Sequence, residues 1–392
     1  MKFRSLGRFD WDVSVLGFGC MRLPSRRINR LRADSKMSKD LIRYGIDQGI
    51  NYVDTAWPYH LGDSEKVLGK ALKDGYRERV FLVTKLPMFM VRKAEHFDKY
   101  LKSQLKRLQT DHIDAYLFHA LGASSFEKVK KFGLLDKMEQ AKKDGTIGGI
   151  GFSFHDTLPV FKEIIDYYPW DLTLVQYNYV DTNIQATTQG IKYAHNKDVA
   201  VAVMEPLKGG TLANLPKEGQ QVIDSAPVKR TAVDWALQFV WNMPEVSVVL
   251  SGMNSKQMVD ANCASADKSK ANSFTEQDKN VLQSLAEIYR KKLAVPCTAC
   301  GYCMPCPEGV NIPQNFACLN NASLETSRLR RIMAKRAYKK LVNSKDKVDK
   351  NNPNGNAGLC IQCNQCVPKC PQQINIPQQL KKVNEKLGKS LF

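Results

Sequence analysis

The feature that most restricts the fold of this chain is a regular alternation of short apolar runs with helical patterns across residues 13–265. The runs are rich in β-branched residues, which is typical of parallel strands covered on both faces. They occupy residues 17–21, 52–55, 80–85, 113–119, 147–153, 172–177, 199–204 and 246–250, each followed by a helical pattern. Eight such units in about 250 residues predict an α/β fold of the (β/α)8 TIM-barrel type, preceded by a hairpin. A doubly wound open sheet is the alternative, although no early strand leads into a G-x-G-x-x-G turn.

The C-terminal part of the chain is predicted to form a second, smaller domain. A helical pattern over residues 275–293 leads out of the barrel, and beyond Pro296 the composition shifts to Cys, Pro, Lys and Asn. We therefore expect a barrel domain at residues 1–290 and a cysteine-rich domain at residues 291–392. A chain of 392 residues is long enough for both.

Charge and hydropathy indicate which partners and which cell compartment to expect. Its formal net charge is +19, and basic residues gather at residues 328–340 and 345–350. Such a balance could attract nucleic acid, an anionic membrane surface or an acidic protein, and a solvated basic face explains it equally well. No nucleic-acid motif accompanies it, so we expect no nucleic acid. No apolar run approaches the ~18 residues of a membrane span. The N-terminus lacks the apolar stretch of a signal peptide, and we therefore expect a cytoplasmic protein.

Ionisable residues stand at or just beyond the carboxyl ends of three predicted strands. They are Asp54, Tyr59, Lys85 and His119. A tyrosine is too weak an acid for proton transfer at neutral pH, but an adjacent lysine cation lowers its pKa. Asp54 would hold Lys85 in place and keep it charged, and His119 can donate a hydrogen bond to a substrate oxygen. Together these groups could protonate a carbonyl oxygen as a hydride reaches the carbon.

A glycine-containing turn after the seventh strand offers a further candidate site. Lys208, Gly209 and Gly210 could form a phosphate-binding loop, because glycines let backbone N–H groups approach an anion. A plain turn explains the same residues equally well.

The order of the strands and three short motifs resemble the aldo-keto reductases. The motifs are the D-T-A-W-P-Y segment at residues 54–59, Thr84-Lys85 and the segment at residues 117–119. The resemblance implies an oxidoreductase in which Asp54, Tyr59, Lys85 and His119 form a catalytic tetrad, with NADPH or NADH across the strand ends. It further implies that Ser153 and Gln176 bind the nicotinamide carboxamide and that Asn262 lies near the adenine.

The chain also departs from the usual pattern of that family. Phe154 follows Ser153 where many members have Asn, and Met204 stands where many have a Tyr that stacks on the nicotinamide. Met258 replaces an Arg that often meets the 2′-phosphate of NADPH. Lys256 could substitute only as a point charge, so the sequence predicts no strong preference for NADPH.

Nine of the eleven cysteines fall between Cys297 and Cys370. Eight of them form two motifs, and the second motif has the spacing of bacterial ferredoxins while the first is one residue shorter. The motifs are Cys297, Cys300, Cys303 and Cys306, then Cys360, Cys363, Cys366 and Cys370. The ferredoxin resemblance implies a ferredoxin-like domain with two [4Fe-4S] clusters. It assigns one cluster to the first three cysteines with Cys370, and the other to residues 360, 363 and 366 with Cys306. Zinc, or a single cluster, remains open.

The two parts of the chain lead to competing hypotheses about function. The leading one is NAD(P)H-dependent reduction of a small carbonyl compound, or the reverse oxidation of an alcohol, coupled to iron–sulfur electron transfer. The second is a flavin-containing electron-transfer enzyme whose clusters are reduced by an acidic ferredoxin or flavodoxin. The third is a regulatory binding module whose clusters are structural or redox-sensing.

Overall fold

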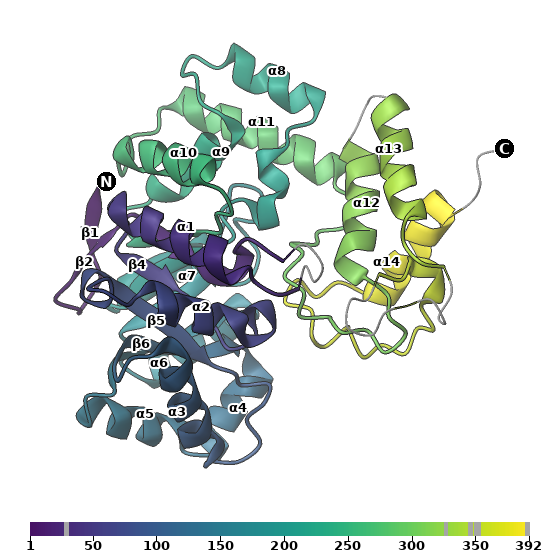
Figure 1. The fold of residues 1–392 in the computed structure, drawn as a ribbon. Coiled ribbons are helices and arrows are strands. Elements are labelled where there is room, and N and C mark those ends of the chain that lie inside the picture. Colours follow the sequence, from purple (N-terminus) through teal and green to yellow (C-terminus); the bar gives the residue numbers. More distant parts are fainter. Residues whose placement is uncertain (27–30, 325–327, 344–347, 349–353, 389–392) are drawn as a thin grey trace. The chain divides into compact units, whose positions relative to one another are not determined.

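The computed structural model describes all residues except 27–30, 325–327, 344–347, 349–353 and 389–392. The chain forms two compact units (Figure 1). The first comprises residues 1–206 and 236–273, and the second comprises residues 207–235 and 274–392. The division of the sequence into domains at residue 290 stays a prediction. Of the basic stretch at residues 345–350, only Val348 lies within the described residues.

The first unit contains a closed barrel of eight parallel strands among its described residues, which confirms the predicted TIM-barrel fold. The strands follow one another around the barrel in sequence order, and β10 closes it against β3. They are β3 (Leu16–Gly19), β4 (Tyr52–Asp54), β5 (Phe81–Leu86), β6 (Ile113–Leu121), β7 (Ile147–Phe154), β8 (Leu172–Gln176), β9 (Ala200–Met204) and β10 (Val248–Ser251). The open doubly wound sheet is thereby excluded.

The helical patterns expected after the strands, and the one at residues 275–293, are present as helices. They are α1 (Ser35–Asp47), α2 (Asp63–Ala71), α3 (His96–Leu108), α5 (Leu134–Lys143), α6 (Leu158–Tyr167), α7 (Thr187–His195), α9 (Ala232–Trp241), α10 (Lys256–Asp267) and α11 (Glu276–Lys292). The sequence analysis missed α4 (Ala123–Lys131) and α8 (Lys217–Ser225). Each buries only two residues, so few apolar positions mark it in the sequence.

The predicted N-terminal hairpin is also present and covers the amino-terminal end of the barrel. Strands β1 (Phe3–Ser5) and β2 (Asp12–Ser14) pair antiparallel. Leu6 and Val13 are fully buried in the apolar cluster that fills the barrel interior. The ring of Phe9 lies 4.9 Å from that of Phe81, the first residue of β5. The interior is therefore sealed at this end, and only the carboxyl ends of the strands are left to carry a site.

The second unit is built from helices and loops around its own apolar core. Helices α12 (Ile312–Leu324), α13 (Arg328–Lys339) and α14 (Ile376–Val383) lie together in the green-to-yellow part of the chain (Figure 1). Their core includes Phe316, Leu319, Tyr338 and Leu380, and six of the eight motif cysteines pack against it or belong to it. Among the described residues, no helix is both long enough and apolar enough to cross a membrane.

Candidate active site

Three of the four predicted tetrad residues share one face of the barrel wall. Asp54 ends β4 and pairs with Val83 of β5. Lys85 lies two residues further along β5 and pairs with Leu117 of β6, and His119 lies two residues beyond Leu117. Because side chains alternate along a strand, Asp54, Lys85 and His119 point to the same side as Val83 and Leu117, which fill the interior. The register therefore stacks the polar groups above the apolar core.

Lys85 and Asp54 form a buried ion pair. The Lys85 Nζ donates to both carboxylate oxygens of Asp54 at 2.7 Å and to the backbone oxygen of Thr55 at 2.8 Å. The side chains of Lys85 and Asp54 are 1% and 4% exposed. Burial raises the pKa of Asp54, and the charge and hydrogen bonds of Lys85 oppose that rise. The pair thus holds a fixed cation at the mouth of the barrel.

Tyr59 is brought to this cation by the loop after β4. It opens the short helix η2 (Tyr59–Gly62), and its ring centroid lies 5.3 Å from the Lys85 Nζ. Its ring also meets the His119 ring edge-on, with the two centroids 6.0 Å apart. The next residues, His60 and Leu61, have φ angles of 52° and 55°, a left-handed conformation that costs bulky residues about 1–3 kcal/mol each. The His60 Nε2 accepts a hydrogen bond from the Leu23 N–H at 3.1 Å, which helps to fix the turn.

His119 is neutral in this environment. Burial lowers its pKa well below the usual value, and the positive charge of Lys85 and then His155 lower it further. A neutral imidazole carries one N–H donor and one acceptor nitrogen. His119 can therefore donate a hydrogen bond to an oxygen at the barrel mouth without adding a second full charge beside Lys85.

A buried polar network behind the tetrad was not found by the sequence analysis. Glu65 of α2 is fully buried and accepts hydrogen bonds from Thr84 Oγ1 at 2.8 Å and Gln104 Nε2 at 2.5 Å. It also pairs with Arg107 at 3.2 Å, whose guanidinium stacks 3.5 Å from the centroid of Trp57. Burial raises the pKa of Glu65, and its hydrogen bonds and the charge of Arg107 oppose that rise. The network fixes Thr84, next to Lys85, and one face of Trp57 in the tyrosine loop.

The residues assigned to the nicotinamide carboxamide lie at the carboxyl ends of neighbouring strands. Ser153 of β7 pairs with Leu174 of β8, and Gln176 lies two residues beyond Leu174 on the same face. The Ser153 hydroxyl accepts a hydrogen bond from the Ala120 N–H at 2.8 Å. A hydroxyl and an amide side by side at the barrel mouth suit the amide of a nicotinamide in kind and in position.

The side-chain amide of Gln176 forms hydrogen bonds within the protein. Its Nε2 donates to Asp181 at 3.2 Å, and its Oε1 accepts from the Gln185 Nε2 at 2.9 Å. The Gln185 Oε1 in turn lies 3.1 Å from the His155 Nδ1. A nicotinamide that used Gln176 would have to share it with this chain of polar groups.

At the predicted adenine end, the structure shows little that would recognise a phosphate. Asn262 is buried and donates to the Ser251 hydroxyl at 3.0 Å. Met258 is 45% exposed on the first turn of α10. Lys256 lies over the ring of Tyr44, with its Nζ 4.7 Å from the centroid. Neither Met258 nor a lysine directed at an aromatic ring offers the planar fork that binds a phosphate in two places.

The predicted phosphate-binding residues Lys208, Gly209 and Gly210 lie in the second unit, in η4 (Lys208–Ala213). All three have positive φ angles, and Lys208 is buried. A Cβ atom on Gly209 would stand 2.1 Å from the backbone oxygen of Thr298, so only glycine fits there. The loop is therefore packed against the residue that follows the first motif cysteine.

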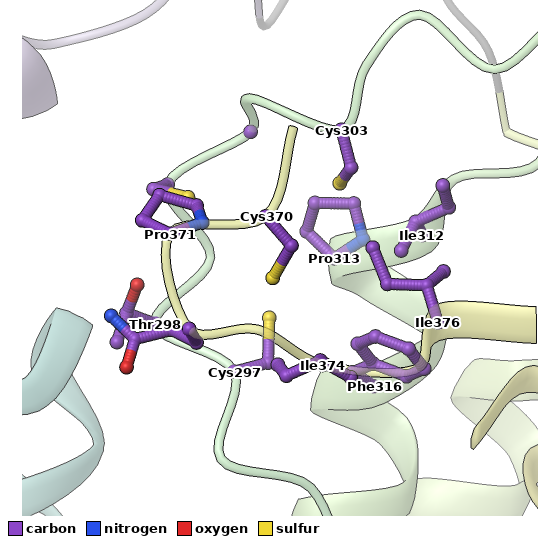
Figure 2. Close-up of a pocket in the computed structure, with 13 residues that line it drawn as sticks. Cys297, Thr298, Cys303, Ile312, Pro313, Phe316, Cys370, Pro371, Ile374 and Ile376 are labelled. Carbon is purple, nitrogen blue, oxygen red and sulfur yellow. The ribbon is translucent and has the colours of Figure 1, made fainter. Parts of the chain in front are cut away.

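The first group of cysteines lines one cavity of the second unit. Cys297, Cys300, Cys303 and Cys370 surround about 310 Å³ of space, part of it open to solvent, and Figure 2 shows three of their sulfur atoms turned toward it. Burial raises the pKa of Cys303, and its neighbours Cys300, Cys297 and Cys370 raise it further. Within the described residues, no three His, Cys, Asp or Glu side chains converge closely enough to hold a single metal ion. Four thiols around an apolar cavity fit an iron–sulfur cluster.

The second group draws one cysteine from the first motif. Burial raises the pKa of Cys366 to about 11, and Cys306, Cys360 and Cys363 add to the rise. Cys306 acts on Cys360 in the same way. Cys370 thus lines the cavity of the first group and Cys306 interacts with Cys360 and Cys366, and the role of all eight cysteines as ligands stays a prediction.

Comparison with known proteins agrees with both parts of the chain. A model of the Aldo/keto reductase family matches residues 15–279, and a model of the 4Fe-4S dicluster domain matches residues 296–375. L-galactose dehydrogenase of Arabidopsis thaliana is 26% identical over 73% of this chain and 95% of its own length. NADH-specific methylglyoxal reductase of Escherichia coli is 26% identical over 54% of this chain and 69% of its own. A solved aldo-keto reductase of Bacillus halodurans in its holo form superimposes with a TM-score of 0.61 at 27% identity, covering 73% and 96% of the two chains. These matches confirm the resemblance inferred from the sequence.

Replacing Lys85 by Met should destabilise the protein in a pH-dependent way. Removing one partner of a buried ion pair typically costs about 3–5 kcal/mol. The variant keeps Asp54 buried without its cation, so the folded-state pKa of Asp54 rises further above its unfolded value. The penalty is absent below the unfolded pKa and grows as the pH rises through the folded pKa. Chemical denaturation at several pH values should therefore show a deficit that shrinks on acidification.

The exposed pair of Lys137 and Asp98, with a separation of 2.8 Å, supplies the control. Lys137→Met should cost no more than about 1 kcal/mol at any pH. The double variant Asp54→Asn with Lys85→Met should recover much of the loss. A deficit for Lys85→Met that does not change with pH would show that removing Lys85 leaves the protonation of Asp54 in the folded protein unchanged, and would contradict this electrostatic account.

Proposed function

The chain belongs to the aldo/keto reductase family of oxidoreductases and carries a C-terminal 4Fe-4S dicluster domain, and from this premise we propose its reaction. We infer that it reduces a small carbonyl compound with NADPH or NADH, or oxidises the corresponding alcohol, in connection with iron–sulfur electron transfer. The observation that carries the proposal is the buried pair of Lys85 and Asp54, with Tyr59 and His119 beside it at the strand ends.

Each of the four residues has its own role in the transfer of one proton. A bound nicotinamide supplies a hydride to the carbonyl carbon or takes one from the alcohol carbon. The hydroxyl of Tyr59 gives a proton to the carbonyl oxygen during reduction and takes it back during oxidation. Lys85 favours the phenolate form of Tyr59 by its charge, and Asp54 keeps Lys85 fixed and ionised. The neutral imidazole of His119 donates a hydrogen bond that orients the substrate oxygen.

We assign Ser153 and Gln176 to the nicotinamide carboxamide and Asn262 to the adenine side. Lys208, Gly209 and Gly210 form the proposed phosphate loop. The cysteines of the two motifs would hold two [4Fe-4S] clusters, which transfer single electrons. The names of two relatives, a methylglyoxal reductase and a sugar dehydrogenase, favour a small polar carbonyl or alcohol as substrate.

A second candidate is a flavin-containing electron-transfer enzyme that receives electrons from an acidic ferredoxin or flavodoxin. Two observations favour it. Gln176 is already hydrogen-bonded to Asp181 and Gln185, and Met204 supplies no aromatic ring for the nicotinamide. A flavin exchanges both hydride and single electrons, and would therefore reconcile the tetrad with the clusters. In either case we place the protein in the cytoplasm.

Replacing Tyr59 by Phe should lower the turnover of methylglyoxal, used as the test carbonyl, by about 10²- to 10⁴-fold, because the proton donor is lost. Nicotinamide binding should stay unchanged, since the ring is retained. Steady-state kinetics and fluorescence titration separate the two effects. Tyr193→Phe is the matched control, because it removes an exposed hydroxyl that donates to Asp166. Equal turnover of Tyr59→Phe and the parent protein would reject the tetrad mechanism, whereas no turnover in either protein would favour a regulatory binding module.

Replacing Met258 by Arg should shift the cofactor preference toward NADPH. The parent protein is expected to bind NADH at least as tightly as NADPH, and a guanidinium at this position would tighten NADPH binding by roughly tenfold. Titration with both cofactors measures the ratio. Met333→Arg adds the same charge at a similarly exposed methionine in the second unit and should leave the ratio unchanged. An equal change in both variants would exclude a phosphate contact at residue 258.

A further inference from the structure

The two cysteine motifs wrap in the same way but lie in different surroundings. In the first motif, Ala299 and Gly301 have φ angles of 54° and 79°. In the second, Gln362 and Asn364 have φ angles of 56° and 60° at the corresponding positions. The local backbone is therefore alike, and any difference in exposure comes from what packs around each motif.

That difference is large. Thr298, which follows the first cysteine of the first motif, is 2% exposed, whereas Ile361 at the same place in the second motif is 65% exposed. All five residues 361–365, with Cys363 among them, are exposed. In the first motif a polar residue is buried, and in the second an apolar residue faces solvent, which is the reverse of what folding alone favours.

The burial of the first motif has a visible cause within the second unit. The backbone of Gly209 lies against the carbonyl of Thr298. The cavity of the first group is also walled by Ile312, Phe316 and Ile376 (Figure 2). The first group is thus partly covered by its own unit, with Thr298 against the loop at Gly209, while residues 361–365 of the second group are all exposed.

The chain around the exposed segment is positively charged. Residues 354–388 contain four lysines, at 369, 381, 382 and 386, and one acidic residue, Glu385, for a net charge of +3. Helix α14, which carries Lys381 and Lys382, packs against η6 (Ala357–Leu359), the turn that leads into Cys360. Both of these lysines are exposed. Such a surface attracts and orients an acidic protein.

We propose that the exposed segment at residues 361–365 is the docking site for a small acidic ferredoxin, with Ile361 as its apolar contact and Lys381 and Lys382 as its charged contacts. This surface rests on the proposed iron–sulfur function of the domain. A cluster held by Cys360, Cys363, Cys366 and Cys306 would accept one electron from the ferredoxin at each encounter, or return one to it. Two encounters balance the two electrons of one hydride.

The test measures binding rather than turnover. The full-length protein, prepared anaerobically, is titrated by calorimetry with an acidic 2[4Fe-4S] ferredoxin at low and high salt. We expect binding that weakens with salt and that falls by about tenfold in Ile361→Asp, which adds a negative charge and removes the apolar contact. Ile184→Asp changes a 41% exposed isoleucine of the first unit in the same way and should bind like the parent protein.

A second variant tests the same surface in case Ile361→Asp loses the cluster. If Ile361→Asp lacks the iron–sulfur absorption of the parent, the double variant Lys381→Glu with Lys382→Glu replaces it in the test. Both lysines lie outside the cysteine motif, and their replacement should weaken binding at least as much. Undiminished binding in the variant that retains the absorption would overturn the proposal. So would protection of residues 361–365 from hydrogen exchange in the protein alone, since the segment would then be covered by its own chain or by a second copy.

The result also separates this surface from the function on which it rests. Salt-sensitive binding through Ile361 without any electron transfer would support the docking surface and refute the coupling. Electron transfer from the ferredoxin that is unaffected by both variants would support the coupling and refute this surface.

Discussion

The structure of the barrel mouth depends on the ion pair between Lys85 and Asp54. Both side chains are almost fully buried, and burying either charge alone is strongly unfavourable. The pair is possible because β4 and β5 are neighbours in a register that puts Lys85 one step above Asp54 on the same face. The carbonyl of Thr55 satisfies a third hydrogen of the ammonium group. The charge of Lys85 acts on several buried groups around it. It lowers the pKa of His119, and it opposes the rise in pKa that burial and Asp54 give to the thiol of Cys20.

Much of this arrangement could be predicted from the sequence, and the reasons are local. The strands were recognisable because each is a continuous apolar run, and a polar residue at its end must face the mouth, as Asp54, Lys85 and His119 do. Glu65 was missed because a glutamate within an amphipathic helix usually faces water. Only the packing of α2 against α3 shows that it is buried beside Gln104 and Arg107. The contact between Gly209 and Thr298 was equally hidden, since nothing in the sequence connects these two residues.

In the cysteine domain, too, the sequence indicated the cysteine motifs but not how the surrounding residues pack on them. The ferredoxin resemblance implied that the fourth cysteine of each motif would serve the other; Cys370 lines the cavity of the first group, Cys306 acts on Cys366, and the ligand sets stay a prediction. The spacing could not show that the first group would be the more covered of the two, because that depends on the loop at residues 208–210 and on the helices of the second unit. Two similar motifs thus acquire different surroundings, with one directed to the interior of the unit and the other to solvent.

The central claim is that nicotinamide-dependent chemistry at Tyr59 is connected to the clusters of the second unit. An anaerobic titration of the purified protein with NADH and then NADPH, followed by visible absorption, tests it most directly. The account predicts that the iron–sulfur absorption bleaches as the reduced nicotinamide is added, about one equivalent for two clusters, since each cluster takes one electron. An iron–sulfur band that is present but unchanged by both nicotinamides would contradict the claim.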